Sequence, residues 1–259
     1  MKIDLQLLTE VAKGAACAAG KKILEIYEAA DVEVAYKKDD SPLTKADQAA
    51  HHVIMEFLLE TGIPVLSEEG KDIPYTERSQ WDYFWMVDPL DGTKEFIRKN
   101  GEFTVNIALI HTGQPILGVV YAPVLDWLYW GNGEEGAWKQ VGNGVAERLI
   151  LPSGRRVDTI VASRSHLTEE TQAFLDKFPG VEVVSMGSSL KFLLVAENKA
   201  QVYPRFAPTM EWDTAAAHGV LKAMGAEVLL AGGTEPLRYN KEVLLNPYFV
   251  CFNTGVLPD

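Results

Sequence analysis

The pattern of apolar residues changes near residue 152, and this change is the feature that most constrains the fold. Before it, two segments with helical spacing, residues 4–30 and about 44–61, precede a series of strand-like runs separated by turn residues. After it, short apolar strands alternate with helical segments. We therefore expect an α/β (α+β) fold in which helices and an antiparallel-rich sheet occupy residues 1–151. Residues 152–259 are expected to form an α/β lobe with a sheet and covering helices.

Charge and composition narrow the classes of ligand. With 24 Lys and Arg against 36 Asp and Glu, the chain carries a formal net charge of −12, and 47% of its 259 residues are apolar. So many apolar residues can bury a substantial core. An acidic surface repels nucleic acid and anionic lipid. An anionic ligand would therefore need a local reversal of sign, which a bound cation can supply.

The expected cellular compartment follows from the lack of membrane and secretion signals in the sequence. No apolar run reaches the roughly 18 residues of a membrane helix, and the first residues lack the layout of a signal peptide. Cys17 and Cys251 stand in apolar settings, so two thiols are favoured over a disulfide. We expect a cytoplasmic protein, with peripheral association at the inner face of the cell membrane as an alternative.

The segment VDPLDGT, residues 87–93, is the first candidate site. Asp88 and Asp91 end the apolar run DYFWMV, and Asp-Pro and Asp-Gly taken alone are common turn dipeptides. The next residues, GTKEFIRK, can begin a helix, whose first N–H groups at Gly92 and Thr93 could bind a phosphate. The segment is therefore either a simple turn or an anion site lined by carboxylates.

Further acids stand at comparable places. Glu68 and Glu69 follow the short strand of IPVLSEEG, and Asp213 opens a helical segment in EWDTAAAH. Ligand sites form at strand ends and helix starts in open α/β layers. Carboxylates gathered there repel one another unless a hard cation such as Mg²⁺ neutralises them. Such ions would also attract phosphate oxygens, which favours metal-dependent phosphoryl hydrolysis.

Four ordered motifs carry a resemblance to a known family. LTKAD (43–47), SEE (67–69), WMVDPLDGT (85–93) and EWDTAAAH (211–218) resemble the inositol monophosphatase superfamily of Mg²⁺-dependent, lithium-sensitive phosphatases. Within it, DPLDGTKEFIRKNGEFTVNIALI, GSSLKFLLVAE and YPRFAPTMEWDTAA look most like the 3′(2′),5′-bisphosphate nucleotidases of the CysQ type. The resemblance implies a layered α-β-α-β-α sandwich.

The resemblance also implies residue roles. The metal ligands for two to three Mg²⁺ ions would be Glu68, Asp88, Asp91, Asp213 and the carbonyl of Leu90, with Glu69 solvated or behind the ligands. Asp47 and Thr93, with Glu68, would orient and deprotonate the attacking water. The substrate would contact Glu68, Leu90, Asp91, Gly92, Thr93 and Asp213 around the scissile phosphate. On the nucleotide side, we expect Ser163, Arg164, His166, Gly187, Ser188, Ser189, Lys191, Tyr203 and Arg205, although Lys191 could also be an ordinary helix-surface lysine.

The implied activity is hydrolysis of the 3′-phosphate of adenosine 3′,5′-bisphosphate (PAP). In-line attack by metal-activated water would give AMP and phosphate. The reaction would belong to sulfur assimilation and PAP recycling. Li⁺ would inhibit it, and the sulfonated nucleotide PAPS would be a further substrate. One alternative is an inositol- or sugar-phosphate monophosphatase with the same metal site. Another is a non-catalytic regulator that binds metal or nucleotide. The sequence is compatible with a monomer or a homodimer.

Overall fold

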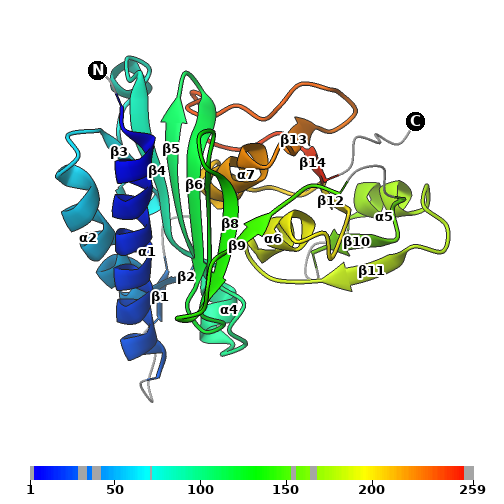
Figure 1. Ribbon diagram of the computed structural model, residues 1–259, viewed down its shortest axis with the longest axis horizontal. Coiled ribbons are helices and arrows are strands. Elements are labelled where there is room, and N and C mark those ends of the chain that lie inside the picture. The colour runs from blue at the N-terminus through cyan, green and yellow to red at the C-terminus, as the bar shows by residue number, and fades with distance from the viewer. Residues whose placement is uncertain are drawn as a thin grey trace.

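A computed structural model describes residues 3–28, 34–36, 42–70, 72–152, 156–163 and 168–253. The described chain forms five layers, in which two sheets alternate with helices (Figure 1). The layered α-β-α-β-α sandwich expected from the sequence is therefore confirmed.

A seven-stranded sheet forms the second layer. Its order is β3-β4-β5-β6-β7-β8-β9, and its strands are β3 (Val65–Ser67), β4 (Tyr83–Asp91), β5 (Thr104–His111), β6 (Gln114–Ala122), β7 (Trp127–Asn132), β8 (Gly136–Val141) and β9 (Glu147–Leu149). Only the β3–β4 pair is parallel; the other five pairs among these strands are antiparallel. This sheet matches the antiparallel-rich pattern predicted for the first half of the chain.

Helices α1 (Leu5–Tyr27) and α2 (Lys45–Leu59) cover the outer face of this sheet (Figure 1). The Asp4 side chain caps α1 by accepting a hydrogen bond from the Leu7 N–H at 3.0 Å. Buried residues such as Leu8, Ala12 and Ala19 recur at helical spacing and face the sheet. Two short strands, β1 (Val34–Tyr36) and β2 (Pro42–Thr44), lie between these two helices in the sequence and pair antiparallel with each other.

The central layer contains α6 (Leu190–Ala196) and α7 (Trp212–Ala223), and a five-stranded sheet follows it. That sheet has the order β11-β10-β12-β14-β13, built from β10 (Thr159–Ala162), β11 (Glu182–Ser185), β12 (Val202–Arg205), β13 (Glu227–Leu230) and β14 (Phe249–Phe252). Helix α5 (Glu169–Leu175) packs on its outer face. The strand–helix alternation predicted for the second half is present.

Some elements were not predicted. Strand β14 pairs antiparallel with both β12 and β13 and so lies inside the second sheet. The sheet is consequently mixed, since β10 pairs in parallel with β11 and β12. The short elements β9, η1 (Glu68–Gly70) and α3 (Tyr75–Arg78) were also missed. Helix α4 (Thr93–Ile97), expected after VDPLDGT, has five residues.

One apolar core joins the two predicted lobes. Phe84 and Val120 from the first sheet and Val161 and Phe249 from the second belong to the same cluster, with α7 residues such as Ala216 between them. The boundary near residue 152 remains a prediction, but the packing makes both ranges depend on α7. Among the described residues, no helix combines the length and apolar character needed to cross a membrane.

Candidate active site

The site begins where β4 pairs with β5. The register places Asp88 opposite Asn106 and Asp91 opposite Thr104, with an irregularity between the two pairs. Pro89 cannot donate a backbone hydrogen bond, and such residues are tolerated at irregular positions of a sheet. The Leu90 N–H instead donates to Asp88 Oδ1 at 3.0 Å. The irregularity therefore directs two aspartates toward one side of the strand end.

Asp213 completes a carboxylate cluster from a distant part of the sequence. It lies in the first turn of α7, and its Oδ2 accepts a hydrogen bond from the Met210 N–H at 2.8 Å. Carboxylate oxygens of Asp88, Asp91 and Asp213 all lie within 4.8 Å of one another. Such spacing allows three side chains to bind one hard cation or a pair of ions.

A small pocket surrounds the cluster. It is lined by Glu68, Asp88, Leu90, Asp91, Gly92, Thr93, Lys94, Glu95 and Asp213. All five metal ligands implied by the family resemblance are among them. Of the two acids that follow β3, it is Glu68 that contributes to this lining. The structure therefore brings the predicted ligand set together, while their role as ligands stays a prediction.

The electrostatics of the cluster favour a cation. Burial raises the pKa of Asp88 well above its usual value, and the negative charges of Glu68, Asp91, Asp213 and Asp47 add to this rise. Burial likewise raises the pKa of Asp213, with Asp91 and Glu68 contributing repulsion and the Met210 N–H opposing it. The bare carboxylates therefore repel one another, and a cation would relieve that repulsion.

Asp47 and Thr93 form the predicted pair. Asp47 lies in the first turn of α2 and is 2% exposed. Thr93 Oγ1 lies 3.1 Å from Asp47 Oδ1 and 3.4 Å from the Leu90 carbonyl oxygen. The hydroxyl thus bridges α2 and the turn that carries the carboxylates. This arrangement is suited to moving a proton away from a water at the cluster.

The loop before α6 holds Asp91 from the other side. Ser188 Oγ and the Ser189 N–H each donate to Asp91 Oδ2 at 2.6 Å. Thr104 Oγ1 lies 2.7 Å from Ser188 Oγ and 2.8 Å from Ser189 Oγ. Asn106 Oδ1 accepts from Ser189 Oγ at 2.9 Å. A buried network therefore fixes the Oδ2 atom of Asp91.

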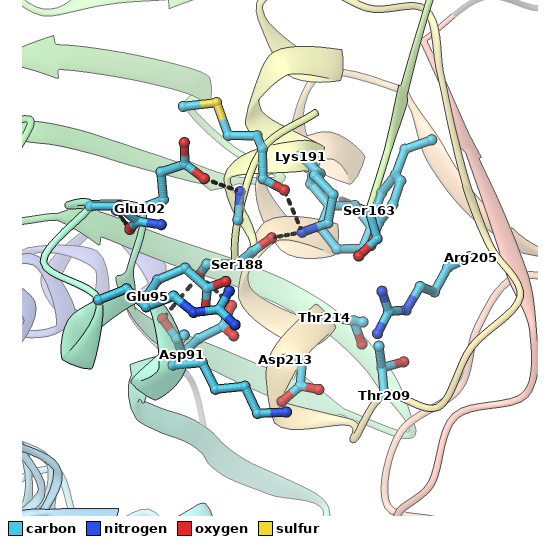
Figure 2. A pocket seen from close by; sticks show the side chains of 18 residues that line it. Asp91, Glu95, Glu102, Ser163, Ser188, Lys191, Arg205, Thr209, Asp213 and Thr214 are labelled. Carbon is cyan, nitrogen blue, oxygen red and sulfur yellow. Dashed lines mark hydrogen bonds between the residues drawn. The ribbon is translucent and has the colours of Figure 1, made fainter. Parts of the chain in front are cut away.

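A second pocket adjoins the first, and the two share Asp91, Gly92, Lys94, Glu95 and Asp213. Its other lining residues include Ser163, Gly187, Ser188, Lys191, Tyr203 and Arg205, six of the predicted nucleotide-side residues. Figure 2 shows Lys191 reaching toward the loop of Ser188, and Arg205 on the far side of Asp213 and Thr214. The pocket thus combines hydroxyl groups with two cations from the second lobe.

Other nucleotide-side predictions have different outcomes. Arg164 and His166 lie outside the described residues. The Ser189 side chain is 1% exposed and is occupied by Thr104 and Asn106. Lys191 is not a helix-surface lysine, because it is only 6% exposed.

Sequence reasoning missed Thr104, Asn106 and Glu102. Thr104 and Asn106 are two residues apart in an apolar strand, so they share one face. That polar pair was the available signal, but its meaning depends on pairing with β4. Glu102 accepts a hydrogen bond from the Gly187 N–H at 2.8 Å, a contact with no sequence signature.

Comparison with known proteins identifies the class. The profile of the inositol monophosphatase family matches residues 4–256. The chain therefore belongs to the inositol monophosphatase family, as its motifs had suggested.

Particular relatives narrow this further. The chain is 51% identical over 236 residues to the 3′(2′),5′-bisphosphate nucleotidase CysQ of Salmonella typhimurium, a match that covers 89% of this chain and 94% of that protein. The chain is 36% identical over 240 residues to the protein of the same name from Haemophilus influenzae, and this match covers 90% of this chain and 87% of that protein. A crystal structure of CysQ from Bacteroides thetaiotaomicron superposes with a TM-score of 0.86 at 51% identity, covering 95% of this chain and 97% of that one.

Proposed function

We propose that this chain is a Mg²⁺-dependent 3′(2′),5′-bisphosphate nucleotidase that removes the 3′-phosphate of PAP and leaves AMP. The observation that carries the proposal is the convergence of Asp88, Asp91 and Asp213 beside a pocket that contains Lys191 and Arg205. One part of the site suits a cation, and the other suits an additional phosphate. The activity for which the relatives at about half identity are named supports the same assignment. Its place would be PAP recycling in sulfur assimilation.

The residues present fit a hard divalent cation. The donors are carboxylate and carbonyl oxygens, which are the ligands that Mg²⁺ prefers. The raised pKa values of Asp88 and Asp213 indicate that bare negative charge is costly there. We assign Glu68, Asp88, Asp91, Asp213 and the Leu90 carbonyl as the residues that would hold two to three ions. When bound, the metal would lower the pKa of a water and stabilise charge on the phosphate.

Asp47 and Thr93 would move the proton. The Thr93 hydroxyl lies within hydrogen-bond reach of Asp47, whose carboxylate is buried and can accept a proton passed along this pair. Glu68 lines the same pocket and would help to orient the water. Gly92 and Thr93 line this pocket and would border the scissile phosphate. These residues would orient the water for attack opposite the leaving 3′-oxygen.

The adjoining pocket would bind the rest of the nucleotide. Arg205 donates from Nη2 to the Pro208 carbonyl at 3.0 Å, and Lys191 lines the same pocket. Ser163 and Tyr203 line the space between strand ends. A substrate with a second phosphate would use these cations, whereas an inositol monophosphate has no group to reach them. PAPS, a monomeric or dimeric state, and the cytoplasmic location remain expectations from the sequence.

Relative turnover tests this assignment. We expect kcat/KM for PAP to exceed that for inositol 1-phosphate by at least about 100-fold, since roughly 3 kcal/mol is typical of a lost buried charge contact. Adenosine 3′-phosphate, which lacks the 5′-phosphate, should fall between them. Lithium should inhibit all three reactions. Faster turnover of the inositol ester would make the chain a sugar-phosphate monophosphatase with the same metal site.

A further inference from the structure

Lys191 is a buried cation with an unusual set of partners. Its side chain lies on the first turn of α6 and is 6% exposed. The Nζ group donates to the carbonyl oxygens of Met186 at 3.1 Å and Ser188 at 2.6 Å, as Figure 2 shows. Burial lowers the pKa of Lys191 to about 8, and the negative charges of Asp91, Glu95 and Glu102 oppose that fall. Two of its three donors are therefore spent on the loop of residues 186–189.

That loop has a conformation that requires support. Ser188 has a φ of +54°, in the left-handed region that residues other than glycine adopt at a cost. Gly187 donates its N–H to Glu102 Oε2 at 2.8 Å. A Cβ atom at Gly187 would lie 2.8 Å from the Glu102 carbonyl oxygen, so the loop sits closely on the segment before β5. Lys191 Nζ satisfies two carbonyl oxygens of this turn by donating hydrogen bonds to them.

The same loop orients the carboxylate of Asp91. Ser188 Oγ and the Ser189 N–H both donate to Asp91 Oδ2 at 2.6 Å, and Asn106 Nδ2 lies 3.4 Å from that oxygen. Ser188 is thus the residue at which the two sets of bonds meet. Its carbonyl accepts from Lys191, and its hydroxyl donates to Asp91.

We propose that Lys191 is a positioning residue for the metal site: it locks the 186–189 loop in the conformation that orients Asp91, and so determines Mg²⁺ affinity even without nucleotide. The inference rests on the proposed function, because it takes Asp91 to be a metal ligand. It differs from the expectation that Lys191 serves only as a nucleotide contact. Groups that hold a metal ligand in place commonly change metal affinity by about 10- to 100-fold when they are removed.

Mg²⁺ binding measured by calorimetry without nucleotide tests the inference. We expect Lys191→Met to weaken Mg²⁺ binding by about 10-fold or more. Lys199→Met is the matched control, because Lys199 follows the other end of α6 and pairs with Glu197 at 3.0 Å. The control should bind Mg²⁺ within about 2-fold of the unaltered protein, a ratio worth only about 0.4 kcal/mol. Circular dichroism establishes that each variant is folded.

A second pair of variants separates positioning from a general loss of structure. Ser188→Ala removes the link to Asp91 from the loop side and should also weaken Mg²⁺ binding. If both residues act through Asp91, the double variant should be little weaker than Lys191→Met alone. Lys191→Arg keeps a cation and should retain part of the affinity. Independent, multiplicative losses would overturn the inference.

Asp91→Asn makes the two possible failures distinguishable. If this variant binds Mg²⁺ normally, the metal role of Asp91 and the proposed function fail together. If it binds weakly while Lys191→Met binds normally, only the positioning role is overturned. Should Lys191→Met not fold, Ser188→Ala decides the matter, since unchanged Mg²⁺ affinity there would also overturn the inference.

Discussion

Asp213 illustrates how single residues at this site oppose stability until a cation is bound. Its pKa is raised in the folded protein by burial and by Asp91 and Glu68. The pKa of an Asp side chain in the unfolded chain is about 3.9. Below that pH, a carboxyl whose pKa is raised by folding does not reduce the stability of the folded protein. As the pH rises through the raised pKa, the folded protein loses stability relative to the unfolded chain. The metal-free protein should therefore be penalised at neutral pH by its own carboxylates.

We predict that Asp213→Asn raises the melting temperature of the protein in EDTA at pH 7–8. The amide oxygen can still accept from the Met210 N–H, so the contact at 2.8 Å survives while the charge is lost. The advantage should shrink as the pH falls toward the unfolded pKa of Asp. With excess Mg²⁺ the order should reverse, because the unaltered protein binds the ion better. Scanning calorimetry with Asp158→Asn, an exposed acid, as control measures this.

If Asp213→Asn is less stable than the unaltered protein in EDTA at neutral pH, the cluster is not repulsive. The carboxylates would then be held by other interactions, and the argument for a cation from their electrostatics would fail.

Thr93 provides a prediction about catalysis at the same scale. Thr93→Val keeps the shape of the side chain but removes the hydroxyl 3.1 Å from Asp47 Oδ1. We expect kcat to fall by about 10²- to 10⁴-fold, the range typical of a lost proton-transfer group. Thr93→Ser, which retains the hydroxyl, should keep most of the activity. Steady-state kinetics with PAP at saturating Mg²⁺ distinguishes the two, and equal losses would argue against a proton-transfer role.

At the scale of elements, α7 positions Asp213 by lying unusually close to the first sheet. A Cβ atom at Gly118 of β6 would lie 2.0 Å from the carbonyl oxygen of Ala216, and one at Gly219 would lie 2.8 Å from the Gly118 nitrogen. Two glycines facing each other thus allow backbone to approach backbone. The approach brings the first turn of α7 to the end of β4.

Gly118→Ala should consequently displace α7. We expect a loss of stability of about 2–4 kcal/mol, as for severe overpacking, together with weaker Mg²⁺ binding because Asp213 moves. Gly133→Ala is the control, since a Cβ atom there meets nothing within 4 Å. Chemical denaturation and Mg²⁺ titration provide the two measurements. A stable Gly118→Ala variant with normal Mg²⁺ affinity would show that α7 tolerates displacement.

The long elements could be predicted from their patterns, and the missed ones show why others could not. Residues 4–30 carry small and apolar residues at helical spacing, and α1 occupies Leu5–Tyr27. Strand β14 is a run of four buried residues, Phe249–Phe252, after a long irregular segment, and so short a run has no readable period. The carboxylates were recognisable because their motifs are ordered. The contacts that Ser188, Ser189 and Asn106 make to Asp91 could not be recognised in the sequence, because they arise from strand register and loop packing.

At the scale of the whole molecule, the apolar cluster between the two sheets is shared by both halves of the chain. Val161 and Phe249 of the second sheet belong to the same cluster as Phe84 and Val120 of the first. Neither half can therefore bury this cluster alone. Asp213 stands on the helix between the sheets, so the metal site and the core depend on the same packing.

This packing predicts a single cooperative unfolding transition. Urea unfolding followed by tryptophan fluorescence and by far-ultraviolet circular dichroism should give coincident curves. Two transitions, or curves with different midpoints, would indicate that the predicted lobes 1–151 and 152–259 unfold separately.

The central claim is that an acidic protein with a net charge of −12 binds an anionic substrate through cations held by Asp88, Asp91 and Asp213. Phosphate release from PAP by protein stripped with EDTA, before and after Mg²⁺ is added, tests this most directly. We predict negligible release without Mg²⁺ and rapid release with it, with AMP as the nucleotide product. Release that does not depend on Mg²⁺, or adenosine 3′-phosphate as the product, would contradict the account.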